Sequence, residues 1–252
     1  TLSNGAKVYV KPTKLKEDEV IFNAFAPIGV AGYQAMSDAT ARVLPYVGAF
    51  GLLAGGTYNT ADIRKMLAGK VVDLSVSLGE FETEIEGHSS VKDLPDMLEL
   101  FYATYLTPNL DAEEWSASQS QLATILASAA TNPQLMFQKY ANQSLYRAPR
   151  SQMTSADDVK EASRDEILAY INTINKNAAA YTFCIVGNVD TATLRPLVEK
   201  YIASLPAEAV TVTATAFDPA YGVTPGKETS TYSMAMQTPQ TWVQIIATGN
   251  EE

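Results

Sequence analysis

The sequence contains very little of the two residue types that most often bind metals or react covalently. Among its 252 residues, Cys184 is the only cysteine and His88 is the only histidine. A single cysteine excludes a disulfide bond within the chain and any zinc site built from cysteines. Cys184 lies in the apolar run YTFCIVG, so we expect a buried and unreactive thiol.

Clustered positive charge and long apolar runs are also missing. The 18 Lys and Arg residues are outnumbered by 28 Asp and Glu, and no run of basic residues is longer than two. Nucleic-acid binding needs clustered Lys and Arg, so we expect no nucleic-acid partner. No segment approaches the roughly 18 consecutive apolar residues of a membrane-spanning helix, so we expect no membrane span.

No signal peptide is visible, and a strand-like pattern already begins near Thr1. We therefore expect the chain to be a piece of a longer polypeptide. The sequence does not indicate a compartment. The parent protein would be exported, for example to the periplasm, if its missing N-terminal part carries a signal.

The residues that are present suffice for a sizeable core, because 46% are hydrophobic and only 18% are charged. Residues 2–12 and 19–29 have strand patterns that we expect to form an antiparallel pair, and residues 71–90 alternate on both sides of Gly79 as a hairpin does. Mostly antiparallel strands with helices on one face predict an α+β domain. The other segments are a strand at 179–190 and helices at 37–51, 59–70, 90–106, 116–149, 163–174 and 191–206.

Two helical segments carry local signals. In residues 37–51, SDATARVLPYVGAFG, Arg42 is the only positive charge, and we expect Pro45 to open a second short helix. In residues 163–174, Ser163 is the expected N-cap and Glu166 stands at the capping-box position.

Carboxylates gather on the second arm of the hairpin. Glu82, Glu84 and Glu86, with Glu80 at the turn, share one face because strand side chains alternate. One interpretation is a solvated sheet face, and the other is an acidic lining that favours basic peptides. Carboxylates spaced two apart spread about 7 Å between neighbours, which disfavours a metal cluster. His88 follows two residues later, and we interpret it as a hydrogen-bonded surface residue rather than a ligand.

The character of the chain changes after residue 206. Residues 207–252 are rich in Thr, Pro and Gly and then show two further strand patterns within 230–249. We therefore predict one domain at 1–206, followed by a linker and the first strands of a second, truncated copy of the module.

Three ordered segments resemble the pitrilysin/insulinase-type (inverzincin) zinc peptidases, namely TLSNGAKVYV, VKDLPDMLELFYATYLTPNLDAEEW and IVGNVDTATLRPLVEKYIASLP. The resemblance covers about residues 1–206. It implies an αβ-roll of the mitochondrial processing peptidase type, repeated in pairs that close around a peptide chamber. In the catalytic roll of that family, a His-x-x-Glu-His helix and a later Glu hold a zinc ion, which activates water for peptide hydrolysis.

This chain departs from that motif at every position. Arg42 and Tyr46 stand where the histidines would be, and Pro45 stands in place of the Glu. The later Glu would fall within QLATILAS, residues 121–128, inside a stretch without acidic residues. Arg keeps its proton and Pro has no ligand atom, so we predict no catalytic residue and no metal ligand here. Zinc is expected instead in the catalytic roll of the parent or of a partner.

The resemblance therefore implies a non-catalytic roll from the C-terminal half of a zinc metallopeptidase, inactive by itself. We expect it to close the peptide chamber and to help bind an extended peptide. The expected partners are a catalytic roll, in the same polypeptide or a companion subunit, and peptide substrates. The substrate-facing candidates are Arg42, Tyr46, Glu82, Glu84 and Glu86.

Other interpretations remain at this point. The chain could be a scaffold or assembly roll of a larger complex with no proteolytic role, or, less favoured, an independent metalloenzyme built on His88 and the acidic strand. Arg42 could contact peptide carbonyls, or it could belong to a helix that is merely relieved of catalytic duty. The edge strand DLSVSL, residues 73–78, could extend by pairing with a peptide or dock the partner half.

Overall fold

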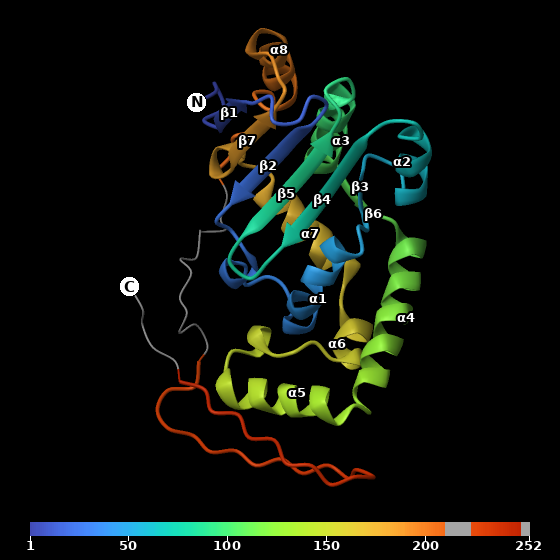
Figure 1. Ribbon diagram of the computed structural model, residues 1–252, viewed down its shortest axis with the longest axis vertical. Coiled ribbons are helices and arrows are strands. Elements are labelled where there is room, and N and C mark those ends of the chain that lie inside the picture. The colour runs from blue at the N-terminus through green and yellow to red at the C-terminus, as the bar shows by residue number, and fades with distance from the viewer. Residues whose placement is uncertain (210–222, 248–252) are drawn as a thin grey trace.

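A five-stranded sheet organises the chain in the computed structural model, which describes residues 1–209 and 223–247 (Figure 1). Its strands lie in the order β1 (Lys7–Pro12), β7 (Thr182–Gly187), β2 (Val20–Ala26), β5 (Thr83–Ser89) and β4 (Val72–Leu78). A separate two-stranded sheet pairs β3 (Leu53–Gly55) with β6 (Pro108–Leu110). The helices are α1 (Asp38–Ala49), α2 (Thr60–Met66), α3 (Leu94–Leu106), α4 (Ala112–Ala129), α5 (Pro133–Leu145), α6 (Ala156–Glu161), α7 (Arg164–Ile174) and α8 (Thr191–Tyr201).

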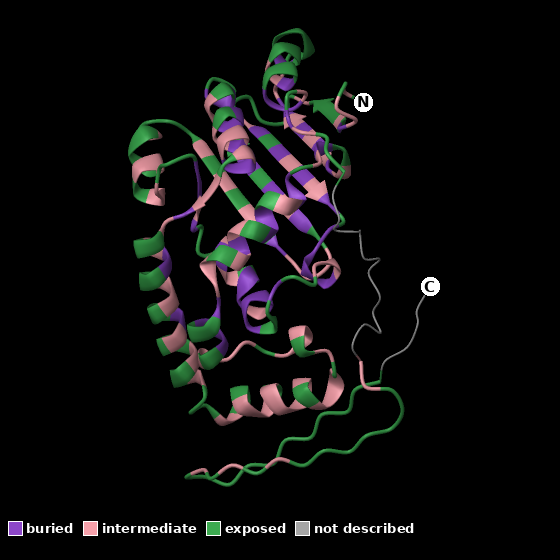
Figure 2. Cartoon of the chain, turned by 180° about the vertical axis from the view of Figure 1, so that it is seen from behind, coloured by how far each residue is buried: buried purple, intermediate pink, exposed green. Residues whose placement is uncertain are grey.

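Among the described residues, helices cover only one face of the large sheet. In β2 and β7 the residues alternate between buried and accessible, as a half-covered sheet requires. On the covered face, the ring of Phe22 lies 4.7 Å from that of Phe101 in α3, and Phe183 lies 6.0 Å from Phe101. Each fully buried Phe side chain contributes about 2 kcal/mol through removal of apolar surface from water. Helices α3 and α7 lie on this side (Figure 2).

The α+β class, the hairpin and the helices predicted within 59–70, 90–106, 163–174 and 191–206 are confirmed. Strands β4 and β5 pair antiparallel in the register that the alternation predicts, with Val76 opposite Ile85. Helix α2 begins after Asn59, whose side chain accepts a hydrogen bond from the backbone of Asp62. None of the helices in the described ranges combines the length and apolar character needed to cross a membrane.

The predicted antiparallel pair of the first two strands is wrong, because β7 lies between them. β1 pairs parallel with β7, and β2 pairs antiparallel with its other edge. The connection before β2 is tied to the end of β7, since the Asn188 backbone N–H donates to the Glu19 carbonyl at 3.2 Å. Gly187 permits this approach, because a Cβ there would lie 2.2 Å from the same carbonyl oxygen.

Two local predictions on helices need correction. Pro45 opens no second helix, since α1 is continuous through Ala49 and Pro45 is an exposed interior residue. The Thr154 hydroxyl donates to the Arg42 carbonyl at 2.8 Å, beside the position where proline removes a donor. Ser163 caps α7 as predicted, but Glu166 completes no capping box there, because its carboxylate accepts from the backbone N–H and the hydroxyl of Ser37 at the start of α1.

The prediction that Cys184 is buried is wrong. Cys184 lies in the middle of β7 with intermediate exposure, because the sheet face onto which its side chain points carries no helix.

The described part of the C-terminal segment contains no strand, only two isolated bridges, of Ala207 with Asn177 and of Val223 with Tyr146. Residues 230–247, where strand patterns are predicted, form no strand in this structure, and residues 248–249 lie outside the described residues. The following, truncated copy of the module stays a prediction. The segment runs beside α5 instead (Figure 1), with the rings of Tyr140 and Tyr232 stacked at 3.6 Å. An isolated apolar strand has no ladder to join, so aromatic contacts with a helix replace strand pairing.

Candidate functional site

The side chain of Arg42 on α1 bonds within the chain. One terminal nitrogen donates to the Pro149 carbonyl at 2.5 Å, and the other pairs with Asp158 Oδ1 at 2.5 Å. Asp158 lies in the first turn of α6, and its other oxygen accepts from the Ser155 backbone N–H at 2.7 Å. Both side chains are mostly buried, at 16% and 13% exposed. The position expected for a zinc-binding histidine thus holds an internal ion pair that ties α6 to α1.

The electrostatics of this pair favour the charged form of the acid. Partial burial raises the pKa of Asp158, but hydrogen bonds from Arg42 and Ser155 outweigh it and hold the pKa below its usual value. The ion pair therefore persists at neutral pH.

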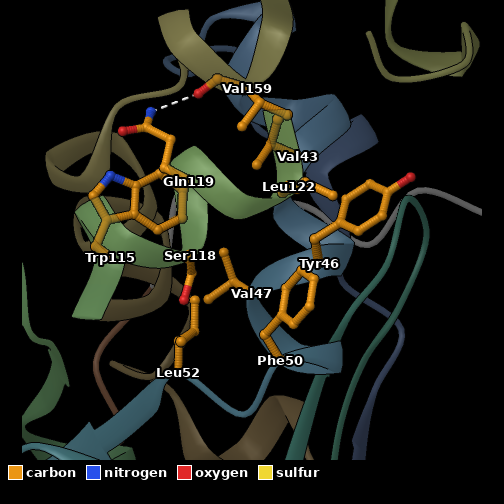
Figure 3. Close-up of a pocket in the computed structure, with 10 residues that line it drawn as sticks. All are labelled: Val43, Tyr46, Val47, Phe50, Leu52, Trp115, Ser118, Gln119, Leu122 and Val159. Carbon is orange, nitrogen blue, oxygen red and sulfur yellow. Dashed lines mark hydrogen bonds between the residues drawn. The ribbon is translucent and has the colours of Figure 1, made fainter. Parts of the chain in front are cut away.

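Tyr46 lies one turn further along α1 and faces an apolar contact with α4. Figure 3 shows the tyrosine ring beside that of Phe50, with its hydroxyl pointing away from the contact. The cavity within this contact measures about 10 Å³, far below the roughly 300 Å³ of a typical ligand pocket. Leu122, from the segment where the second Glu is expected, fills the α4 side. The residues that line the cavity are Val43, Tyr46, Val47, Phe50, Leu52, Trp115, Ser118, Gln119, Leu122 and Val159.

The residues at this position do not fit a zinc ion. Arg42 has no free lone pair, Pro45 has no ligand atom, and leucine stands on the facing helix. In the described part of the chain, no group of three or more His, Cys, Asp or Glu residues could hold a metal ion. The arrangement stabilises the contact of α1 with α4 and α6 and supplies no general base or metal-bound water.

The acidic residues of the hairpin lie on the other side of the sheet, away from this contact. Glu84 and Glu86 are in β5 on the face that no helix covers, and Glu82 is exposed just before the strand. The Asn23 side chain donates a hydrogen bond to Glu84. His88 Nε2 lies 3.1 Å from Glu19 Oε1, so the histidine has a hydrogen-bond partner on the surface. The structure therefore separates Arg42 and Tyr46 from the three glutamates.

Strand β4 is one of the two edge strands of the sheet, and its outer edge is partly covered. Ser90 N–H donates to the Val71 carbonyl and Gly79 N–H to the Glu82 carbonyl, so odd-numbered residues of β4 bond to β5. The backbone groups of even-numbered residues then point outward. At Val76 the outward carbonyl meets Gly48 of α1, where a Cβ would lie only 1.9 Å from the oxygen. A peptide that paired with β4 could not use Val76.

Sequence reasoning missed the residues that fix the segment before α6. The Arg150 side chain, 9% exposed, bonds to Asp38 and to the carbonyls of Val30, Tyr33 and Met36. These partners lie more than 100 residues earlier, and an isolated arginine in a loop gives no sequence signal for them. Asp158 was missed for the same reason.

Comparisons with known proteins agree with this architecture. The family described as "Peptidase M16 inactive domain" matches residues 161–252. No curated protein matches the chain.

Three solved structures share the fold. The periplasmic protease PqqL from Escherichia coli superposes with a TM-score of 0.73 at 18% identity, over 85% of this chain and 23% of that one. A protease from Helicobacter pylori gives 0.66 at 18% identity, over 85% and 52% of the two chains. A peptidase M16 inactive domain from Pseudomonas fluorescens gives 0.61 at 16% identity, over 83% and 51%.

This chain therefore spans between about a quarter and a half of the length of these three proteins. The family match over residues 161–252 and the shared fold make this chain similar to the inactive domain of M16 peptidases.

Proposed function

We propose that this chain is a non-catalytic domain of a zinc-dependent metalloendopeptidase, which closes the peptide chamber and helps to hold an extended peptide substrate. Its partner is a catalytic roll of the same polypeptide or of a companion subunit. Zinc and the water-activating Glu belong to that partner, whose mechanism this chain serves by binding and enclosing the peptide.

The observation that carries this proposal is that an internal packing contact occupies the position where the resemblance places the zinc ligands. Arg42 is committed to Asp158 and Pro149, and Tyr46 packs between α1 and α4. A roll with this contact keeps the scaffold of a peptidase domain without its chemistry. Surface binding is the remaining contribution that such a roll can make to peptide hydrolysis.

The uncovered sheet face is the best-suited place for that binding. The β4 edge is interrupted at Val76, whereas Tyr9 and Ile21 on the open face are 60% and 48% exposed. Exposed apolar side chains on the same face as the carboxylates of Glu84 and Glu86 offer both hydrophobic and charged contacts to an extended chain. Arg42 as a direct peptide contact stays a prediction, with both terminal nitrogens engaged in the present state.

The first test concerns the partner. The gene that encodes this chain, or a gene beside it, is expected to encode an intact His-x-x-Glu-His helix. A peptidase assay of that catalytic roll, with and without this chain, is expected to show faster cleavage of unstructured peptides when the chain is present. Absence of the motif from both genes would overturn the proposal and favour the scaffold role.

The second test concerns the isolated chain. We expect elemental analysis to find no stoichiometric zinc, and we expect no cleavage of unstructured peptides. One tightly bound zinc per chain, retained after dialysis against a weak chelator, would contradict the proposal.

A further inference from the structure

The open sheet face arranges its side chains in rows that cross all five strands. Paired residues in neighbouring strands point to the same side, so each row follows from the strand registers. The three rows, read from β1 to β4, are Lys7–Thr182–Phe25–Glu84–Ser77, Tyr9–Cys184–Asn23–Glu86–Ser75 and Lys11–Val186–Ile21–His88–Asp73.

The rows give the face three chemically different zones. Strand β1 presents Lys7 and Lys11, both exposed and without an ion pair within the described residues. The middle strands present Phe25, Ile21 and Val186. Strands β5 and β4 present Glu84, Glu86 and Asp73.

Other charged residues near this face do not cancel the difference in charge between strand β1 and strands β5 and β4. At the end of β2, Glu19 accepts a hydrogen bond from Lys16 at 2.6 Å and lies beside His88. This exposed pair is electrically close to neutral. The basic zone on β1 and the acidic zone on β5 and β4 therefore remain on opposite sides of middle strands whose apolar side chains on this face are Phe25, Ile21 and Val186.

The spacing of these zones matches the geometry of an extended peptide. Three steps between neighbouring strands separate β1 from β5, which is about 14 Å. In an extended peptide, residues i, i+2 and i+4 point to one side, and four residues span about 13 Å. A peptide that lies across the strands can thus place three side chains on the three zones.

We propose that this face selects extended peptides with a basic and an acidic residue four positions apart and an apolar residue midway. The basic residue meets Glu84 or Glu86, the apolar residue meets Phe25 or Ile21, and the acidic residue meets Lys7 or Lys11. This selectivity rests on the proposed function, since it names the class of peptide that the roll holds.

The experiment measures binding of labelled synthetic peptides to the 252-residue chain by fluorescence anisotropy at low salt. The probe contains K-T-L-T-E between Gly-Ser flanks, and the comparison peptides contain K-T-L-T-K, E-T-L-T-E and K-T-S-T-E. We expect the probe to bind about fivefold more tightly than either like-charged peptide, as two partly exposed ion pairs allow, with the difference shrinking in 0.5 M NaCl.

Charge reversal should change the order of the peptide affinities. A purely structural role of these residues would leave that order unchanged. In the double variant Lys7→Glu and Lys11→Glu, we expect the preference to switch to K-T-L-T-K. In Glu84→Lys and Glu86→Lys, it should switch to E-T-L-T-E. The matched controls Lys92→Glu with Lys176→Glu, and Glu99→Lys with Glu161→Lys, change the net charge equally at exposed positions off this face and should leave the order unchanged.

The possible outcomes separate this inference from the proposed function. Binding of all peptides without charge dependence would overturn the selectivity but leave peptide holding intact. Binding of no peptide would overturn peptide holding itself, and the selectivity with it. A dimer in sedimentation that the Lys7→Glu and Lys11→Glu variant dissociates would assign the face to a second copy of the chain and overturn the inference.

Discussion

At the scale of single residues, two arginines and one glycine determine how α1 is held. Arg42 and Arg150 both bond to partners more than 100 residues away, and together they fix the segment from Pro149 to Asp158 against α1. Gly48 lets the end of the same helix approach the Val76 carbonyl. None of these contacts has a local sequence signal, because each depends on where a distant segment comes to lie.

Gly48→Ala tests that close approach, because two effects predict opposite signs. Helix propensity predicts stabilisation by about 0.5–1 kcal/mol. The new Cβ would lie 1.9 Å from a backbone oxygen that cannot rotate away, so we expect a net loss of about 1–3 kcal/mol in the free energy of unfolding. Urea denaturation followed by circular dichroism measures the change.

The neighbouring residue provides the control for this change. Ala49 is exposed at the end of α1, and Ala49→Gly should cost no more than the propensity difference. A Gly48→Ala variant as stable as the parent would show that the contact with β4 is looser than described.

At the scale of elements, acidic residues in the first turns of helices connect helices that are distant in sequence. Glu166 in the first turn of α7 bonds to Ser37 before α1, and Asp158 at the start of α6 bonds to Arg42. For both acids burial raises the pKa, but the hydrogen bonds they accept outweigh it and lower the pKa below the usual value. A carboxylate with a lowered folded-state pKa stabilises the fold above its unfolded pKa, and this contribution is lost as pH falls through the folded pKa.

Asp158→Asn is therefore expected to lower the free energy of unfolding at neutral pH. It should also make that free energy depend less on pH in the acid range. The change leaves Arg42 without its carboxylate, for which we expect a loss of about 2 kcal/mol at pH 7. Below pH 4 the gap between parent and variant should narrow, because protonation removes the same ion pair from the parent. Denaturation midpoints between pH 3 and pH 7 measure both effects.

Asp157→Asn is the matched control in the same turn, since Asp157 is 81% exposed and forms a surface pair with Lys160. It should leave both the stability and its pH dependence nearly unchanged. A gap between the Asp158→Asn variant and the parent that stays constant down to pH 3 would contradict the proposed role of the ion pair.

At the scale of the whole molecule, the chain consists of a well-packed roll and a less buried arm. The arm is α5 together with residues 223–247 of the C-terminal segment. Helix α3 buries six residues against the sheet, whereas α5 buries none. The ring contacts of α5 are with the C-terminal segment, through Tyr140 with Tyr232 and Phe137 with Trp242. In Figure 2 the colours show the same contrast, with buried residues concentrated on the sheet and the helices that cover it.

Hydrogen exchange should reveal this difference in stability. We expect backbone amides of α5 to exchange at least about tenfold faster than those of α3, because opening α5 exposes little apolar surface. Exchange followed by mass spectrometry on peptic peptides provides the measurement, with α7 as a second reference helix from the core. Equal protection of α5 and α3 would show that the arm is held more firmly than its burial indicates.

The sequence by itself determined the alternating strands, the amphipathic helices and the lack of zinc ligands at Arg42, Pro45 and Tyr46. These features depend on side-chain periodicity and on donor chemistry, which are local properties. Only the tertiary structure decided that β7 separates β1 from β2, that Arg42 pairs with Asp158, and that Lys7 lies across the sheet from Glu84. Each of these joins segments more than 50 residues apart, and such pairings are set by the packing of the whole core rather than by any one segment.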